Sequence, residues 1–307
     1  MTVLPRNRGA AAALLRVLAA LFAMGVLIPA QPSHAAPAAT QRSYDKGLLW
    51  KIEGTTAKPS YLFGTIHSDD ARLNTLPPPV KYHFDRSASF TMEALVNGPG
   101  LVAMAEAMFF NNDTTLQDVL GPELYQRTVK SMATHGLPEA SALKMKPWAA
   151  MVGLSQPPTT SGVYLDLALQ LEAARQSKLS YGLESMAEQI ELFDTLPLDD
   201  QVALLRETVA NHNNLPRQIE ELIQAYTKRD LAGLAAIEQK YKISDARLYH
   251  TLMERLIVKR NQQMLERMRP RLHEGNAFIA VGALHLIGGD GLLALLENAG
   301  YRVSAVY

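Results

Sequence analysis

Two short motifs of the form Gly-x-x-His are the strongest chemical signal in this chain. They occupy 64–67 (Gly-Thr-Ile-His) and 282–285 (Gly-Ala-Leu-His), at the ends of strand-like runs at 60–66 and 277–282. A strand that ends in glycine and then histidine brings an imidazole to the edge of a sheet, where α/β proteins bind ligands. Neutral imidazole is a common ligand for zinc and similar divalent ions. His67 and His285 are therefore candidates for one site built from both ends of the chain.

Two glutamates also end strand-like segments. Glu93 closes the run Ser-Phe-Thr-Met-Glu, and Glu184 closes Tyr-Gly-Leu-Glu. Burying a carboxylate at the end of an apolar strand is costly unless a cation or a metal accompanies it. Two imidazoles and two carboxylates would suit Zn²⁺, Mn²⁺ or Co²⁺, with one carboxylate binding the metal and the other acting as general base on a metal-bound water. The alternative is that the histidines occupy unrelated turns and the glutamates are solvated.

Arg260 lies within a long helix-like segment, directly after Lys259. Its guanidinium can pair with a site carboxylate or clamp a substrate carbonyl or carboxylate. The alternative is a solvated basic pair on a helix surface, which is the usual state of such pairs. Asp69 and Asp70 follow His67 closely and would orient it, bind the metal, or simply form a turn.

Other familiar catalytic motifs are missing from the sequence. It contains no His-Glu-x-x-His, no Gly-x-Ser-x-Gly and no phosphate-binding P-loop. Its lack of cysteine excludes disulfides, thiolate metal sites and a cysteine nucleophile. The remaining histidines of the expected mature chain lie outside strand ends and are predicted on the surface; they are His83, His135, His212, His250 and His273.

Strand-like segments near both ends of the chain must position these residues, with mostly helical segments between them. Strands are expected at 48–53, 60–66, 87–93, 179–183, 277–282 and 302–306. Helices are expected at 116–120, from Pro122, and at 147–154, 163–178, 198–210, 215–228, 231–241, 244–272 and 288–299. Thr115 and Asp230 are the expected N-caps of two of these helices. The pattern predicts a single α/β domain at 47–307, with a mixed sheet from N- and C-terminal strands flanked by helices and a largely helical insertion near 97–260.

The first residues of the chain have the composition of a cleavable signal peptide. Three arginines precede an apolar stretch at 17–28, and Ser33-His34-Ala35 matches a small-x-small cleavage site. We expect a signal peptide at 1–36, a flexible lead-in at 37–46 and a periplasmic or secreted mature protein with no stable membrane span. The alternative is an uncleaved membrane anchor, although the apolar stretch is short for spanning a bilayer.

The overall charge balance indicates little attraction to polyanions. The chain of 307 residues has 30 basic and 30 acidic residues and a formal net charge of +0. A neutral chain has no general electrostatic drive toward nucleic acid or anionic membranes, so no nucleic-acid partner is expected.

The motifs, taken with their context, resemble the TraB/GumN family, which includes the Tiki proteases of animals and the TraB/PrgY pheromone-shutdown proteins. The resemblance extends from about Leu48 to Val303. It rests on Tyr-Leu-Phe-Gly-Thr-Ile-His-Ser at 61–68 and Phe-Ile-Ala-Val-Gly-Ala-Leu-His-Leu-Ile-Gly at 278–288, with support from segments at 116–120, 182–184 and 259–261. The helical middle of the chain matches only loosely.

The resemblance implies an α/β fold shared with erythromycin-esterase-like and ChaN-like proteins. It also implies a metal-dependent hydrolase site, with His67, His285 and Glu93 at the positions of the family's metal-binding motifs. Glu184, Arg260 and Asn261 match recurrent family positions and are candidate catalytic residues. Tiki members cleave peptides and favour Mn²⁺ or Co²⁺, so a peptide or protein substrate is the corresponding expectation.

Two functions remain open at the level of sequence. The first is a metal-dependent hydrolase, specifically a peptidase, that uses water activated by a divalent ion. The second is a non-catalytic extracytoplasmic protein that binds haem or a peptide, with the same histidines as possible ligands of haem iron.

Overall fold

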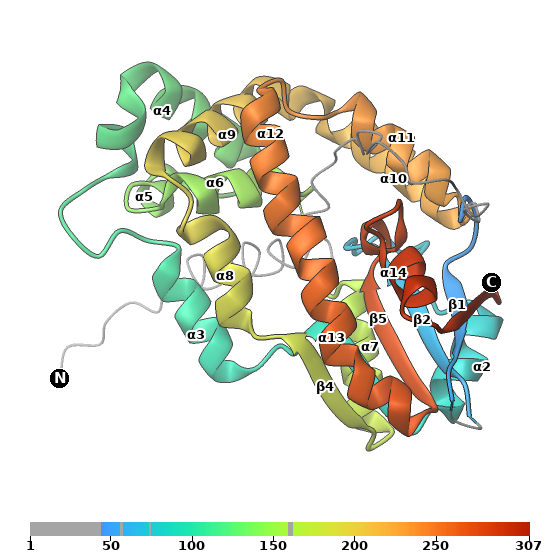
Figure 1. The fold of residues 1–307 in the computed structure, drawn as a ribbon. Coiled ribbons are helices and arrows are strands. Elements are labelled where there is room, and N and C mark those ends of the chain that lie inside the picture. The colour runs from blue at the N-terminus through green and yellow to red at the C-terminus, as the bar shows by residue number, and fades with distance from the viewer. Residues whose placement is uncertain (1–43, 56–57, 74, 159–161) are drawn as a thin grey trace, which may run out of the picture. The chain divides into compact units, whose positions relative to one another are not determined.

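The computed structural model describes residues 44–55, 58–73, 75–158 and 162–307 (Figure 1). The expected signal peptide lies outside the described residues, as does most of the expected lead-in. The last residues of that lead-in are described. The Tyr44 ring packs edge-on against Trp50, with ring centroids 5.3 Å apart, and Lys46 forms a β-bridge with Asp230. The described chain groups into two compact units, one of residues 44–95, 163–185 and 217–307 and one of residues 96–162 and 186–216.

The first unit is built on a mixed β-sheet, which confirms the predicted α/β class. Its strands among the described residues are β1 (Leu49–Glu53), β2 (Ser60–Thr65), β3 (Ser89–Ala94), β4 (Leu179–Glu184), β5 (Ala277–Gly282) and β6 (Arg302–Ala305). They lie in the order β4-β3-β5-β2-β1-β6. The four strands β4, β3, β5 and β2 run parallel, whereas β1 pairs antiparallel with both β2 and β6. The N- and C-terminal strands therefore do share one sheet.

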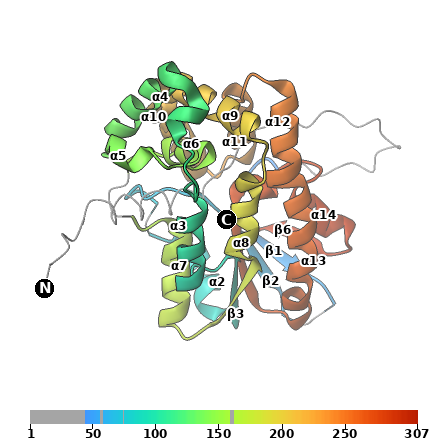
Figure 2. The same cartoon turned by 90° about the vertical axis from the view of Figure 1, so that its left-hand side faces the viewer.

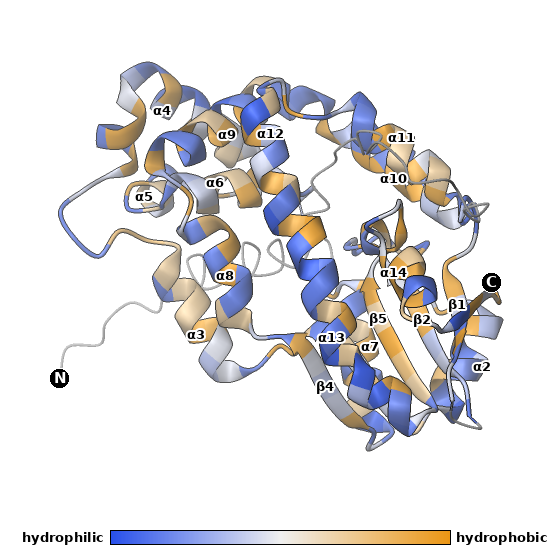
Figure 3. Ribbon diagram, in the orientation of Figure 1, coloured by the Kyte–Doolittle hydropathy of each residue, from blue (hydrophilic) through white to orange (hydrophobic). Residues whose placement is uncertain are grey.

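The centre of the sheet is apolar because it is covered on both faces. Strand β5, with the sequence Ala-Phe-Ile-Ala-Val-Gly, is buried except at its last residue and is coloured hydrophobic in Figure 3. A parallel strand with helices on both faces has no solvent side, and continuous hydrophobic sequence is the usual result. Beside it, Thr65 of β2 pairs with Gly282 of β5. The two Gly-x-x-His motifs thus leave the sheet side by side, one residue out of register.

Helices cover the two faces of this sheet. Figure 2 places α2 (Pro78–Arg86) and α7 (Leu165–Arg175) on one side, with α13 (Lys259–Glu274) and α14 (Leu292–Asn298) on the other. The unit also contains α11 (Leu231–Lys240), α12 (Ala246–Met253) and most of α10 (Leu215–Thr227). The Asp230 side chain accepts a hydrogen bond from the Gly233 backbone, so it caps α11 as predicted.

The long helix expected at 244–272 is interrupted by a π-helical stretch, η3 (Glu254–Val258), between α12 and α13. A π-helix takes more residues per turn than an α-helix; it is rare, and it is frequently found at functional sites. In this segment buried residues recur at every fourth position; they are Leu248, Leu252, Leu256, Arg260, Met264, Met268 and Leu272. Arg260 is therefore the one charged member of an otherwise apolar stripe.

The second unit is helical in its described residues. Its helices are α3 (Gly98–Ala107), α4 (Leu116–Thr134), α5 (Glu139–Ala142), α6 (Pro147–Leu154), α8 (Met186–Asp194) and α9 (Leu198–Asn211), followed by η2 (His212–Asn214). Thr115 caps α4 as predicted, through a reciprocal capping box with Asp118. At Gly121 the backbone turns out of helical geometry with φ 71°, so Pro122 opens a second helical segment, again as predicted.

One histidine of this helical unit is not where the sequence placed it. His135 was expected on the surface, but it is only 8% exposed. Its ring lies 5.1 Å from that of His212, centroid to centroid. Burial, together with the nearby His212, lowers the pKa of His135 to about 4. The helix periodicity alone did not indicate that the end of α4 packs inward.

Among the described residues, no helix is both long enough and apolar enough to cross a membrane.

Candidate active site

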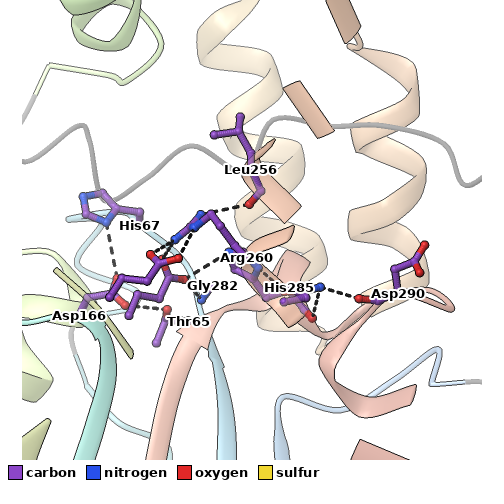
Figure 4. A network of polar contacts seen from close by, with 11 residues as sticks. Thr65, His67, Asp166, Leu256, Arg260, Gly282, His285 and Asp290 are labelled. Atoms are coloured by element: carbon purple, nitrogen blue, oxygen red, sulfur yellow. Dashed lines mark hydrogen bonds and ion pairs between the residues drawn. The ribbon is translucent and has the colours of Figure 1, made fainter. Parts of the chain in front are cut away.

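The candidate residues gather where the four parallel strands end. Glu184 ends β4, Glu93 lies one residue before the end of β3, and the two Gly-x-x-His motifs follow β5 and β2. The carboxyl edge of parallel strands is the usual ligand-binding edge of an α/β sheet. Figure 4 shows the side chains that meet there.

Arg260 binds both glutamates. Its Nε donates to Glu184 Oε1 at 2.8 Å, and its Nη2 donates to Glu184 Oε2 at 2.9 Å and to Glu93 Oε2 at 2.6 Å. Its Nη1 donates to the carbonyl oxygen of Leu256 at 3.1 Å, within the π-helical stretch. Burial opposes the charge on Arg260, but the two carboxylates outweigh it and raise the pKa of the guanidinium. The group is a buried, charge-assisted clamp.

Asn261 fixes the state of His285. The Asn261 amide nitrogen donates to two carbonyl oxygens, at 2.7 Å to Asp290 and at 3.3 Å to His285 itself. Carbonyls only accept, so the amide orientation is determined and Asn261 Oδ1 faces His285 Nδ1 at 2.6 Å. Nδ1 must then be the protonated nitrogen, and Nε2 holds the lone pair.

His285 Nε2 faces a carboxylate oxygen. It lies 3.6 Å from Glu93 Oε1, which also accepts a hydrogen bond from the Gly282 backbone at 2.7 Å. Burial, reinforced by the charge of Arg260, lowers the pKa of His285 to about 3, so the imidazole is neutral. A nitrogen that carries a lone pair and a carboxylate oxygen thus lie 3.6 Å apart without a hydrogen bond between them. Such a pair of acceptors suits a shared cation.

Gly282 leaves room for this close approach. A Cβ at this position would lie 3.3 Å from Glu93 Oε1 and 3.6 Å from His285 Cδ2. The second motif therefore has a glycine at this position because a larger residue would crowd the Glu93 carboxylate and the His285 ring.

His67 lies in a second group of contacts. Its Nδ1 is 3.5 Å from Asp166 Oδ2, and Asp166 Oδ1 accepts a hydrogen bond from the Thr65 hydroxyl at 2.7 Å. The His67 ring stacks on Tyr164, with centroids 4.0 Å apart and planes 25° apart. Asp166 and Tyr164 are functional candidates that the sequence analysis missed. The acidic residue in the first turn of α7 was the only signal available, and it is equally typical of a helix start.

The glycine of the first motif, Gly64, is fixed by a hydrogen bond and by close packing. The Tyr226 hydroxyl donates to the Gly64 carbonyl oxygen at 2.8 Å, and burial, together with the charge of Asp166, raises the pKa of Tyr226 and keeps that hydroxyl protonated. A Cβ on Gly64 would lie 2.8 Å from Leu286 Cδ1 and 3.1 Å from the Ala283 Cα. Both residues belong to η4 (Ala283–Leu286), the short helix that also contains His285.

Replacing Gly64 with alanine should therefore destabilise the protein by about 1–3 kcal/mol, because the added methyl overpacks a backbone contact that has little room to move. Equilibrium urea denaturation of the Gly64→Ala variant measures the loss. Gly98→Ala is the matched control, since a Cβ there meets nothing within 4 Å. Equal stability of the two variants would contradict the proposed close contact.

The structure brings five of the six predicted residues into one connected network; they are Glu93, Glu184, Arg260, Asn261 and His285. His67 belongs to the neighbouring Asp166 group. Across the described part of the chain, no group of three or more His, Cys, Asp or Glu side chains is gathered closely enough to hold a metal ion. His285 and Glu93 offer two donors of suitable chemistry, and His67, which follows the adjacent strand β2, is the candidate for a third.

Comparison with known proteins agrees with the family resemblance of the two Gly-x-x-His motifs. The model of the TraB/PrgY/gumN family matches residues 48–305. Metalloprotease TIKI1 of Danio rerio is 26% identical over 317 residues, covering 86% of this chain and 64% of the relative. Metalloprotease TIKI2 of Xenopus tropicalis is 27% identical over 309 residues, covering 83% of this chain and 59% of the relative. Metalloprotease TIKI1 of Homo sapiens is 26% identical over 317 residues, covering 86% of this chain and 62% of the relative. The chain thus spans less than two thirds of the length of these relatives, and no solved structure matches it.

Proposed function

Because the chain belongs to the TraB/PrgY/gumN family, we propose that it is a metal-dependent hydrolase, and specifically a peptidase. The observation that supports this most directly is the neutral His285 Nε2 facing Glu93 Oε1 at 3.6 Å. The metalloprotease relatives support a peptide or protein as substrate. With the expected signal peptide, the protein would act in the periplasm or outside the cell.

In this proposal His285, Glu93 and His67 hold a divalent ion, with Mn²⁺, Co²⁺ and Zn²⁺ as the candidates. Such an ion would lower the pKa of a bound water and supply a nucleophile near neutral pH. Glu93 contributes Oε1, because its Oε2 is bound to Arg260. Asn261 keeps the proton on His285 Nδ1 and so keeps Nε2 in the form that binds a metal.

Glu184 and Arg260 have supporting roles in this arrangement. Both oxygens of Glu184 accept from Arg260, and Glu184 is the candidate general base for the proton of the attacking water. Arg260 balances the charge of the two carboxylates. The expected contact between Arg260 and a substrate carbonyl would have to use its Nη1 group, whose partner is the Leu256 carbonyl.

The test is metal content and cleavage measured together. We expect wild-type protein to bind Mn²⁺, Co²⁺ or Zn²⁺ in calorimetric titrations and to cleave members of a peptide library in a way that a chelator abolishes. His67→Ala and His285→Ala should each weaken metal binding at least about 100-fold and abolish cleavage, because first-sphere ligands matter more than their outer-sphere partners.

His250→Ala provides the matched control, since His250 is exposed on α12 and should leave both properties unchanged. Unchanged metal binding and cleavage in both site variants would overturn the proposal. A haemin absorption band that shifts on binding and is lost in the same variants, without any peptide cleavage, would replace it with the ligand-binding alternative.

A further inference from the structure

Asp166 lies beside the first Gly-x-x-His motif although it is distant from it in the sequence. We infer that Asp166 is a positioning residue that sets the orientation and tautomer of His67. The inference rests on the proposed metal-binding role of His67. It begins from the two contacts of the carboxylate, with His67 Nδ1 at 3.5 Å and with the Thr65 hydroxyl at 2.7 Å (Figure 4).

The carboxylate and the ring meet in poorly solvated surroundings. The side chain of His67 is 7% exposed and that of Asp166 is 13% exposed. Because little water reaches the pair, solvent screens their interaction weakly. The Thr65 hydroxyl holds Oδ1 and leaves Oδ2 directed at the ring. Asp166 also lies in the first turn of α7, where the helix dipole favours a negative charge.

The plane of the His67 ring is set by the same segment of chain. Tyr164, the N-cap residue of α7, is 3% exposed and stacks on the ring. Tyr164 thus restricts rotation of the ring out of its plane, while Asp166 selects which ring edge faces the carboxylate. The N-terminus of α7 therefore orients the histidine that follows β2.

The second motif has a corresponding arrangement. His285 Nδ1 lies 2.6 Å from the side-chain oxygen of Asn261, whereas His67 Nδ1 lies 3.5 Å from Asp166 Oδ2, a longer ion-pair contact that lacks hydrogen-bond geometry. A hydrogen-bond acceptor at Nδ1, as in His285, or a poorly screened negative charge near it, as in His67, favours the tautomer with its proton on Nδ1, which leaves the lone pair on Nε2. Metal-binding histidines are commonly oriented in this way, and loss of the outer partner typically costs 10–100-fold in metal affinity. Both motifs would then present Nε2, each held by a different helix.

The experiment compares wild type with Asp166→Ala and Asp166→Asn. The first measurement is the ¹⁵N chemical shifts of the His67 ring in metal-free protein at about pH 8, where an ordinary imidazole is neutral. Wild type should show the proton on Nδ1, and Asp166→Ala should shift toward a mixture of tautomers. The second measurement is Co²⁺ affinity, which should fall about 10–100-fold in Asp166→Ala and much less in Asp166→Asn, because the amide oxygen can still accept.

The controls separate this inference from the proposed function. Glu172→Ala removes a partly exposed carboxylate from the same helix and should change neither measurement. If wild type binds no metal, the proposed function fails, while a tautomer change in Asp166→Ala still supports the inference. Identical His67 shifts in wild type and Asp166→Ala would overturn the inference whatever the metal result. If Asp166→Ala does not fold, Thr65→Val, which frees Asp166 Oδ1, gives the same test with a smaller expected shift.

Discussion

Arg260→Leu should lower the free energy of unfolding by about 3–5 kcal/mol, one of the largest effects expected from a single substitution in this protein. Arg260 is 7% exposed, and its guanidinium neutralises Glu93 and Glu184 together. Removing one side of a buried ion pair leaves uncompensated charge in a poor solvent, and this accounts for costs of that size. Urea denaturation followed by circular dichroism measures the change.

The exposed neighbour provides the control for this prediction. Lys259→Leu changes the same charge on the same helix, one residue earlier, and should alter stability by less than about 0.5 kcal/mol. Adding Glu93→Gln and Glu184→Gln to Arg260→Leu should recover part of the loss, because neutral amides cost less to bury than carboxylates. A loss below about 1 kcal/mol in Arg260→Leu would show that the clamp contributes little to folding.

Asn261→Leu should cost about 2–4 kcal/mol of stability and should also weaken metal binding. Asn261 is fully buried and satisfies His285 Nδ1 and the carbonyl of Asp290. Leucine fills the volume but leaves the buried His285 Nδ1 without a partner, at about 1–3 kcal/mol, and removes the hydrogen bond to the carbonyl of the exposed Asp290, at about 0.5–1.5 kcal/mol. Under the proposed function the metal affinity should fall about 10–100-fold, because His285 loses the group that fixes its tautomer.

Asn261→Asp distinguishes the two roles of this side chain. Aspartate keeps an acceptor for His285 Nδ1 but cannot donate to the Asp290 carbonyl. We therefore expect it to lose stability while retaining more metal affinity than Asn261→Leu. Gln262→Leu, at an exposed position one residue later, is the control for both measurements. Metal binding that is equal in wild type and Asn261→Leu would contradict the positioning role of Asn261.

Much of the sheet was predictable because its strands end in residue patterns that are typical of strand ends. A glycine followed by histidine after a hydrophobic run predicts a strand end, and the structure has β2 and β5 ending at Thr65 and Gly282. The one-residue offset between the motifs was not predictable. It depends on the pairing of Thr65 with Gly282, which is a property of the assembled sheet.

The clamp could have been anticipated from a spacing that the sequence contains. Hydrophobic residues at 248, 252, 256, 264 and 268 leave one vacant place in a repeat of four, and Arg260 fills it. A charged residue within an apolar stripe is expected to be buried with partners. Asp166 gave no comparable signal, because its pairing with His67 depends on how the N-terminus of α7 meets the end of β2. The residue pattern around Asp166 does not allow that packing to be predicted.

The π-helical stretch Glu254–Val258 changes the angular phase of the helix that contains Arg260. A step of four residues overshoots one α-helical turn by about 40°, so a stripe with that spacing would wind around a regular helix. The wider π turn absorbs part of this drift just before Arg260 and Asn261. The helices α12 and α13 therefore follow one another through this stretch, but their side chains do not keep the angular positions of one regular α-helix. Gain or loss of one residue within 254–258 would rotate the site residues of α13 relative to α12, so the length of this short segment helps to set the direction in which Arg260 and Asn261 project.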